Sequence, residues 1–215
     1  MRNAAPYLVM MLHVLPAAAQ QPLETKLVIQ QGGRETGREE FTLRQTRGRG
    51  LPGTTIIAAA RYPATAPTTR LAATLERTPE PALAKFQLDV ESDGAVTVIL
   101  AAGSGARLIV RTVAKGSESG RELPGGPDVV LLDDAVYSLY TAVAELATPA
   151  GRPLTAIFPR TGRRASFTAR REPGAGGGTK VTLAGDISGS LQFDAQGRLE
   201  RLEFPGQGIL VTRAQ

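Results

Sequence analysis

The side chains that usually carry acid–base or nucleophilic chemistry are scarce in this 215-residue sequence. It has no cysteine and a single histidine, His13, inside an apolar N-terminal segment. A serine nucleophile needs a base that holds a proton near neutral pH, usually histidine. The sequence has neither the G-x-S-x-G motif of a nucleophile elbow nor an S-x-x-K motif. We therefore expect no catalytic serine or cysteine, no metal site and no cofactor.

Paired carboxylates remain as a route to catalysis, since a glycosidase needs only two acids on opposite sides of a sugar. The most conspicuous pair is Asp133-Asp134, with Glu145 and Asp194 as further acids. Because a helix N-terminus favours acids, we expect Asp133 or Asp134 to cap a helix. Asp194 is expected to bond the backbone two positions on, while Gly197 takes a positive φ. These residues are thus predicted to be structural, and a carboxylate-based hydrolase is the least favoured function.

A basic segment, PRTGRRASFTARRE over residues 159–172, has an obvious ligand chemistry. Arg160, Arg163 and Arg164 could hold a phosphate or a carboxylate through bidentate contacts. The alternative is a solvated strand face and loop, which is the usual meaning of such a charge run.

The N-terminus has the pattern of a secretory leader. Arg2 precedes an apolar run from Ala4 to Leu15, and Pro16 is followed by the small triplet 17–19. The run is shorter than the roughly 20 residues that span a bilayer, so we predict a signal peptide over residues 1–19 rather than an anchor. Its removal takes away the only histidine and Arg2, leaving 24 basic and 20 acidic residues, or +4 in place of +5. We expect an exported protein, periplasmic or extracellular, that does not span the membrane and has no nucleic-acid partner.

Alternation with period two dominates the rest of the sequence. Residues 71–76, 85–91 and 164–170 alternate apolar with polar side chains, which is typical of half-buried antiparallel strands. Tight-turn residues such as Asp93-Gly94 separate such segments at regular spacing. We predict a mainly β protein, a large curved antiparallel sheet or half-barrel of about a dozen strands. Aromatic residues make up only 5%, which disfavours an outer-membrane barrel.

One segment departs from this pattern. Residues 115–128, KGSESGRELPGGPD, are dense in glycine, serine and proline and predict a loop. After it, Val136, Leu139, Tyr140 and Val143 recur at helical spacing, which predicts one helix on the concave face of the sheet. We predict one β-rich domain over residues 20–215, with 115–128 as the place for a seam.

Three segments of the C-terminal half carry a resemblance to known families: VVLLDDAVYSLY, LTAIFPR and GSLQFDAQGRLERLEFPGQGILVTR. They resemble the β-rich N-terminal accessory domain of some bacterial exported α/β-hydrolases, here standing alone. The architecture is also similar to that of periplasmic lipoprotein carriers, in which a curved antiparallel sheet holds a helix. The resemblance implies structural rather than catalytic positions, because the hydrolase machinery is missing.

The favoured function is that of an exported, non-enzymatic binding protein. A lipophilic or amphipathic ligand would lie between the curved sheet and the helix, as in a preformed pocket. The alternative is an accessory or interaction module for an envelope enzyme or assembly partner, by strand addition at a sheet edge. The predicted lining residues, each also a plausible core residue, are Phe41, Leu75, Phe86, Leu88, Tyr137, Tyr140, Phe158 and Phe167.

Overall fold

A single curved sheet organises the whole chain in the computed structural model, which describes residues 23–48, 51–78 and 83–214. In space the 15 strands run β8-β7-β6-β5-β4-β3-β2-β1-β15-β14-β13-β12-β11-β10-β9. All pairs are antiparallel except β9 with β10. The strands are β1 (Leu23–Gln31), β2 (Arg34–Gly48), β3 (Leu51–Tyr62), β4 (Thr69–Thr78), β5 (Leu83–Ser92), β6 (Ala95–Ser104), β7 (Arg107–Ala114), β8 (Ser117–Pro124), β9 (Val129–Leu131), β10 (Arg152–Phe158), β11 (Arg163–Pro173), β12 (Thr179–Gly185), β13 (Gly189–Phe193), β14 (Leu199–Phe204) and β15 (Ile209–Arg213).

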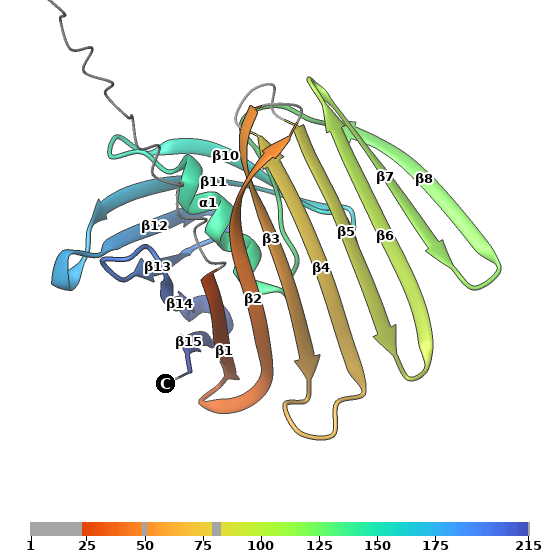
Figure 1. The fold of residues 1–215 in the computed structure, drawn as a ribbon, viewed down its shortest axis with the longest axis horizontal. Helices are drawn as coiled ribbons and strands as arrows, with labels where there is room; N and C mark the ends of the chain where they lie inside the picture. Colours follow the sequence, from red (N-terminus) through yellow and green to blue (C-terminus); the bar gives the residue numbers. More distant parts are fainter. Residues whose placement is uncertain (1–22, 49–50, 79–82, 215) are drawn as a thin grey trace, which may run out of the picture.

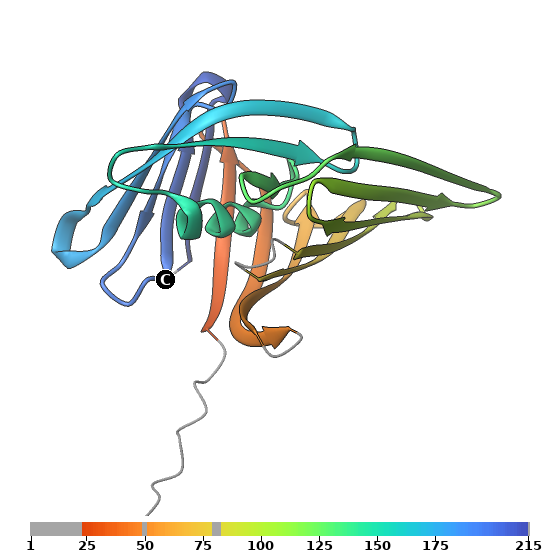
Figure 2. The same cartoon turned by 90° about the horizontal axis from the view of Figure 1, so that it is seen from above.

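The helical segment lies inside the curve of this sheet. It consists of a 3-10 turn, η1 (Tyr137–Tyr140), which runs directly into α1 (Thr141–Leu146). Figure 1 shows β1 to β8 side by side, and Figure 2 shows β10 and β11 passing over α1. Two further 3-10 turns are η2 (Ala175–Gly177) and η3 (Pro205–Gln207). The predicted mainly β class, with a curved open sheet around one α-helix, is confirmed.

The core is one continuous cluster on the inner face of the sheet. Alternation places Leu27, Leu75, Leu108 and Leu202 on this face although they come from strands far apart in the sequence. The helical segment adds Leu139 and its neighbours to the same cluster. Residues before and after 115–128 therefore share one sheet and one core.

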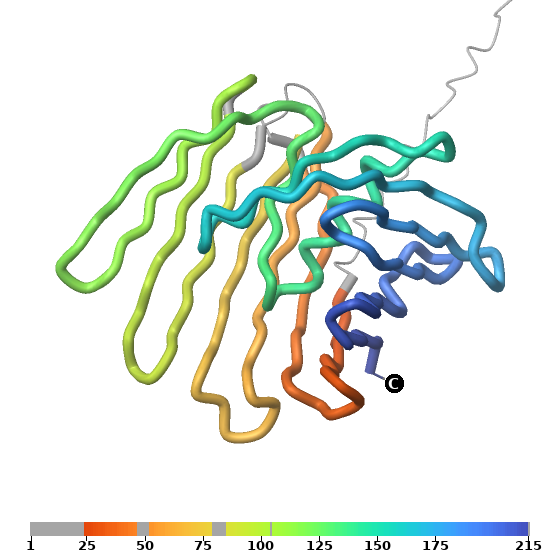
Figure 3. The backbone as a smooth tube through the Cα atoms, turned by 180° about the vertical axis from the view of Figure 1, so that it is seen from behind, coloured from red at the N-terminus to blue at the C-terminus, as the bar shows by residue number. Residues whose placement is uncertain are grey.

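The predicted loop over residues 115–128 is wrong in its central part, because Ser117–Pro124 forms the edge strand β8. The composition of this segment indicated a loop because β8 has no buried face and therefore no alternation of apolar and polar residues. Its registered pairing with β7 supplies the hydrogen bonds, and ion pairs join Arg107 to Glu122 and Arg111 to Glu118 across the two strands. Figure 3 shows this hairpin at the end of the sheet remote from the C-terminus. Among the described residues, no helix is long and apolar enough to span a bilayer.

The turn between β13 and β14 forms as predicted. The Asp194 carboxylate accepts hydrogen bonds from the backbone amides of Gln196 and Arg198, at 3.0 and 2.8 Å, and Gly197 has a φ of 75°. Its second oxygen accepts from Arg198 Nε at 2.7 Å and from Arg213 at 2.8 Å. Asp194 thus fixes the hairpin turn and ties it to β15.

Replacing Asp194 with asparagine is expected to lower the free energy of unfolding by about 1–2 kcal/mol at neutral pH. Burial opposes ionisation, but the hydrogen bonds from Arg198 and Arg213 lower the pKa of Asp194 from 3.8 to about 2. The contribution is therefore fully present above the ordinary pKa of 3.8 and decreases as the pH falls from that value through about 2, so it is already smaller at pH 3. Urea unfolding at pH 7 and pH 3 measures it. The control is Asp93→Asn in the exposed β5–β6 turn, and equal effects of the two variants would contradict the prediction.

Candidate functional site

The polar centre of the molecule is Glu39, whose side chain points into the core from β2 and is 1% exposed. It shares the inner face with Phe41 because the two residues are two positions apart on a strand. Its Oε2 accepts the backbone amide of Tyr137 at 2.7 Å, and its Oε1 accepts that of Ser138 at 2.9 Å. Glu39 therefore holds the first turn of η1 against the sheet.

Burial raises the pKa of Glu39 to about 7. The nearby Asp133 carboxylate adds to this rise, while the Ser138 side chain and the two backbone amides oppose it. The buried Ser138 hydroxyl makes no hydrogen bond of ordinary geometry with any described residue, although it lies close to this carboxyl. A carboxyl that titrates near neutral pH has the property of a general acid or base. Both its oxygens, however, are already occupied by backbone amides, so its observed contacts are structural.

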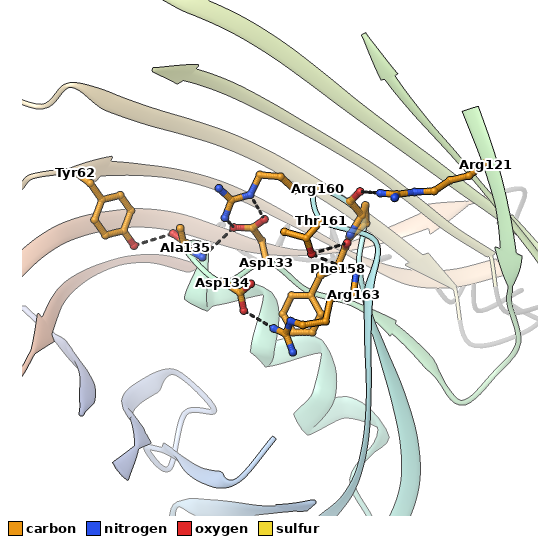
Figure 4. Close-up of polar contacts among 10 residues, drawn as sticks. Tyr62, Arg121, Asp133, Asp134, Ala135, Phe158, Arg160, Thr161 and Arg163 are labelled. Atoms are coloured by element: carbon orange, nitrogen blue, oxygen red, sulfur yellow. Dashed lines mark hydrogen bonds and ion pairs between the residues drawn. The ribbon is translucent and has the colours of Figure 1, made fainter. Parts of the chain in front are cut away.

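Asp133, which is 1% exposed, forms a second buried carboxylate site beside Glu39. Arg160, in the turn after β10, donates to it from Nε and from a terminal nitrogen, each at 2.8 Å. The backbone amide of Ala135 donates to Asp133 Oδ1 at 2.9 Å (Figure 4). The two bonds from Arg160 tie the loop before the helical segment to the β10–β11 hairpin, and the bond from Ala135 fixes the carboxylate within that loop.

The prediction that Asp133 or Asp134 caps the helix is wrong. Neither η1 nor α1 has a side-chain cap from its own N-cap residue, and the carboxylate at the start of η1 comes from Glu39. Asp133 turns back to its own loop and to Arg160, and Asp134 forms an ion pair with Arg163. Glu39, 98 positions before Tyr137, thus accepts the backbone amides at the start of η1, which is the role that was predicted for Asp133 or Asp134.

Tyr62, at the end of β3, makes a second connection between the sheet and the loop that precedes η1. Its hydroxyl donates to the carbonyl oxygen of Ala135 at 2.8 Å (Figure 4). Its ring lies over Gly37 on β2, where a Cβ atom would be 2.2 Å from Tyr62 Cε1. Gly37 therefore leaves the space that the tyrosine ring occupies.

A cavity of about 320 Å³ opens beside these contacts. Its apolar walls include Ile29, Ile209 and the Tyr137 ring, and its polar groups include Gln31 and Asp134. The full lining is Ile29, Gln31, Thr36, Tyr62, Asp134, Ala135, Tyr137, Gln207 and Ile209. We call it the mouth cavity, because it lies where the helical segment meets β1, β2 and η3.

The eight predicted lining residues are all buried in the core. They lie in β2 (Phe41), β4 (Leu75), β5 (Phe86 and Leu88), η1 (Tyr137 and Tyr140), β10 (Phe158) and β11 (Phe167). Tyr137 belongs to both the core and the mouth cavity. Tyr140 instead packs against Phe204, with ring centroids 5.0 Å apart. Sequence analysis missed the other cavity residues, since Gln31, Thr36 and Gln207 have no pattern beyond their place next to turns.

The three predicted arginines have different surroundings. Arg160 binds Asp133, whereas Arg163 pairs with Asp134 and lies 3.5 Å above the Phe158 ring centroid (Figure 4). Arg164 is exposed and forms no ion pair within the described part of the chain. The structure thus does not gather them around one anion, and Arg160 and Arg163 already bind the protein's own carboxylates.

The remaining acids do not converge on a common point. Glu145 accepts a hydrogen bond from Thr54 on β3, while Asp194 lies in the β13–β14 turn. Within the ranges that the structure describes, no group of three or more histidine, cysteine or acidic side chains could hold a metal ion.

β8 is an edge strand of the sheet, which is the kind of position where a partner protein could add a strand. Its exposed side chains include Glu118, Arg121 and Glu122, and Pro124 ends it. Arg121 donates to the carbonyl oxygen of Pro159 in the β10–β11 turn, so this edge also contacts the other end of the sheet (Figure 4). Charges and proline are features that protect an edge from pairing.

No family model and no curated protein matches the sequence. The structure is similar to the crystal structure of a beta-barrel-like protein of the domain of unknown function DUF1849 from Brucella abortus. The TM-score is 0.54 at 9% identity, over 90% of this chain and 96% of that chain. The fold is β-barrel-like. At this identity the likeness shows the architecture alone, and the resemblance to accessory domains of hydrolases and to lipoprotein carriers stays a prediction.

Proposed function

We propose that the protein is an exported, non-enzymatic binding protein that holds a lipophilic or amphipathic ligand in the mouth cavity. The observation that carries this proposal is the composition of the cavity. Ile29, Ile209 and the Tyr137 ring offer an apolar surface, while Gln31, Thr36, Asp134 and Gln207 offer hydrogen-bonding groups. Polar and apolar groups share this lining about equally, which suits an amphipathic ligand, because such a ligand needs surfaces of both kinds.

The position of the cavity adds support. It lies between the curved sheet and the helical segment, where the sequence pattern places the ligand. Its volume of about 320 Å³ is at the lower end of the range of ligand pockets. The ligand is therefore a small amphiphile, or one end of a longer molecule. Export is part of the proposal because residues 1–19 have the sequence pattern of a secretory leader, a prediction that lies outside the described residues.

Replacing Ile209 with tryptophan is expected to weaken binding of the neutral fluorophore N-phenyl-1-naphthylamine at least tenfold, because a larger side chain fills the cavity. Fluorescence titration of the purified chain measures the affinity. Leu210→Trp is the matched control, since the next residue of β15 has its side chain on the opposite face of the strand.

Native mass spectrometry of the protein as purified tests for a ligand acquired in the cell. An added mass that the Ile209→Trp variant lacks would support the proposal. An unliganded protein that also fails to bind the fluorophore would overturn it, as would equal loss of binding in the two tryptophan variants.

A further inference from the structure

A second hollow lies on the outer face of the sheet, away from the mouth cavity. It is a groove of about 450 Å³ over β2 to β6, the strands that Figure 1 shows side by side. Ala59 and Ala72 form part of its floor, and they alternate with the buried residues Ala58 and Ala73. The groove is therefore on the solvent side of the same strands.

Register explains why a hollow forms at this place. Ala59 is directly opposite Ala72, with Glu40 opposite Ala59 on one side and Asp89 opposite Ala72 on the other. Two methyl groups in the middle of a row of long side chains leave a depression between them. Val96 on β6 extends its apolar lining.

The adjacent row carries three arginines on three successive strands. Arg38 is opposite Arg61, and Arg61 is opposite Arg70. Directly opposite residues have Cβ atoms about 5 Å apart, and like charges there repel one another. All three arginines line the groove.

The two outer arginines have their own counter-ions. Arg38 pairs with Glu35 at 2.6 Å, and Arg70 pairs with Glu91 at 3.4 Å. The side chain of Arg61, between them, is exposed and forms no ion pair or hydrogen bond with any residue that the structure describes. An external anion at Arg61 would relieve the repulsion and use a guanidinium whose donors are free within the described chain.

We propose that this groove is a second binding site, for a small amphiphile with one anionic group. The anion, a carboxylate or a phosphate ester, binds Arg61 between Arg38 and Arg70. The apolar part of the ligand lies over Ala59 and Ala72 toward Val96. Glu40 and Asp89 border the floor on either side, so a second anionic group along the apolar part of the ligand would be repelled. The site is separate from the proposed function at the mouth cavity and does not depend on it.

Isothermal titration of the purified chain with three ligands of equal tail length tests the proposal. Octanoate and octyl phosphate distinguish the two anionic groups, and octyl glucoside is the uncharged control. Binding of either anion, with no binding of the glucoside, is the expected result. Failure of both anions to bind, or glucoside binding as tight as theirs, would overturn the proposal.

Two variants with matched controls locate the site. Arg61→Gln is expected to weaken anion binding about tenfold or more, because it removes a charge-assisted contact. Its matched control is Arg44→Gln, which makes the same change on the outer face of β2 but outside the groove. The second variant, Ala72→Leu, fills the floor of the groove and should also weaken anion binding. Its matched control is Ala102→Leu, at an exposed position outside the groove. Equal losses in Arg61→Gln and Arg44→Gln would show diffuse attraction and contradict the proposal. Ile209→Trp should leave this binding unchanged, which separates the groove from the mouth cavity.

Discussion

Replacing Arg160 with glutamine is expected to lower the free energy of unfolding by about 3 kcal/mol. The variant leaves the Asp133 carboxylate, 1% exposed, with the backbone amide of Ala135 as its one remaining hydrogen bond of the three observed. A buried charge that loses its partner retains its desolvation cost without compensation. Because Arg160 itself is one-third exposed, water can partly replace it, which places the effect at the lower end of the range for buried pairs. Chemical denaturation at neutral pH measures the change.

Arg163→Gln is the matched control for this prediction. Arg163 is the first residue of β11, directly after the turn that carries Arg160, and binds the neighbouring acid, Asp134, but both side chains of that pair are over 40% exposed. An exposed pair contributes about 0–1 kcal/mol, so this variant should change the stability little beyond the loss of its contact with Phe158. A double-mutant cycle of Arg160 with Asp133 should give a larger coupling energy than one of Arg163 with Asp134. Equal couplings would contradict a buried role for the Asp133–Arg160 pair.

Local patterns were sufficient to predict the fold class and the turn at Asp194. Strand alternation is a property of successive residues, so residues 85–91 indicate their own inner and outer faces without knowledge of the rest of the chain. The same holds for Asp194 and Gly197, whose hydrogen bonds and φ angle involve a few adjacent residues.

Two features could not be predicted because their causes are not local. β8 is a strand because β7 lies beside it, and its own residues lack a buried face. The mouth cavity depends on how far the sheet curves, which brings β1, η1 and η3 together from distant parts of the chain. Glu39 did leave a signal in the sequence, an acidic residue in phase with Phe41 and Leu43 on the inner face of a strand. A buried acid predicts a partner, but the sequence does not show that the partner is the backbone of η1.

Glutamine at position 39 is expected to remove a pH dependence of stability of up to about 3 kcal/mol. In the native protein, burial raises the pKa of Glu39 from 4.5 to about 7, so the folded state binds a proton more tightly than the unfolded state does. Its contribution to stability is therefore fully present below about pH 4.5 and is lost as the pH rises through about 7. Glutamine does not titrate, but it has one acceptor oxygen where glutamate has two, so one of the backbone amides of Tyr137 and Ser138 loses its acceptor. This loss lowers the stability of the variant by an amount that does not change with pH. The amide group of glutamine can also donate to the nearby Ser138 hydroxyl, which the carboxylate cannot do.

The measurement is the free energy of unfolding of wild type and Glu39→Gln at several values between pH 4.5 and pH 8.5. The free energy of unfolding of Glu39→Gln minus that of wild type should increase as the pH rises. The midpoint of this increase should lie between the pKa of 4.5 in the unfolded state and the pKa of about 7 in the folded state. Glu40→Gln is the matched control, because the adjacent side chain is exposed on the outer face of the same strand. Asp194 does not interfere, since its contribution changes only at much lower pH. A Glu39→Gln curve parallel to that of wild type would mean that Glu39 titrates at an ordinary pKa, and its carboxylate would then hold η1 in the ionised form throughout this range.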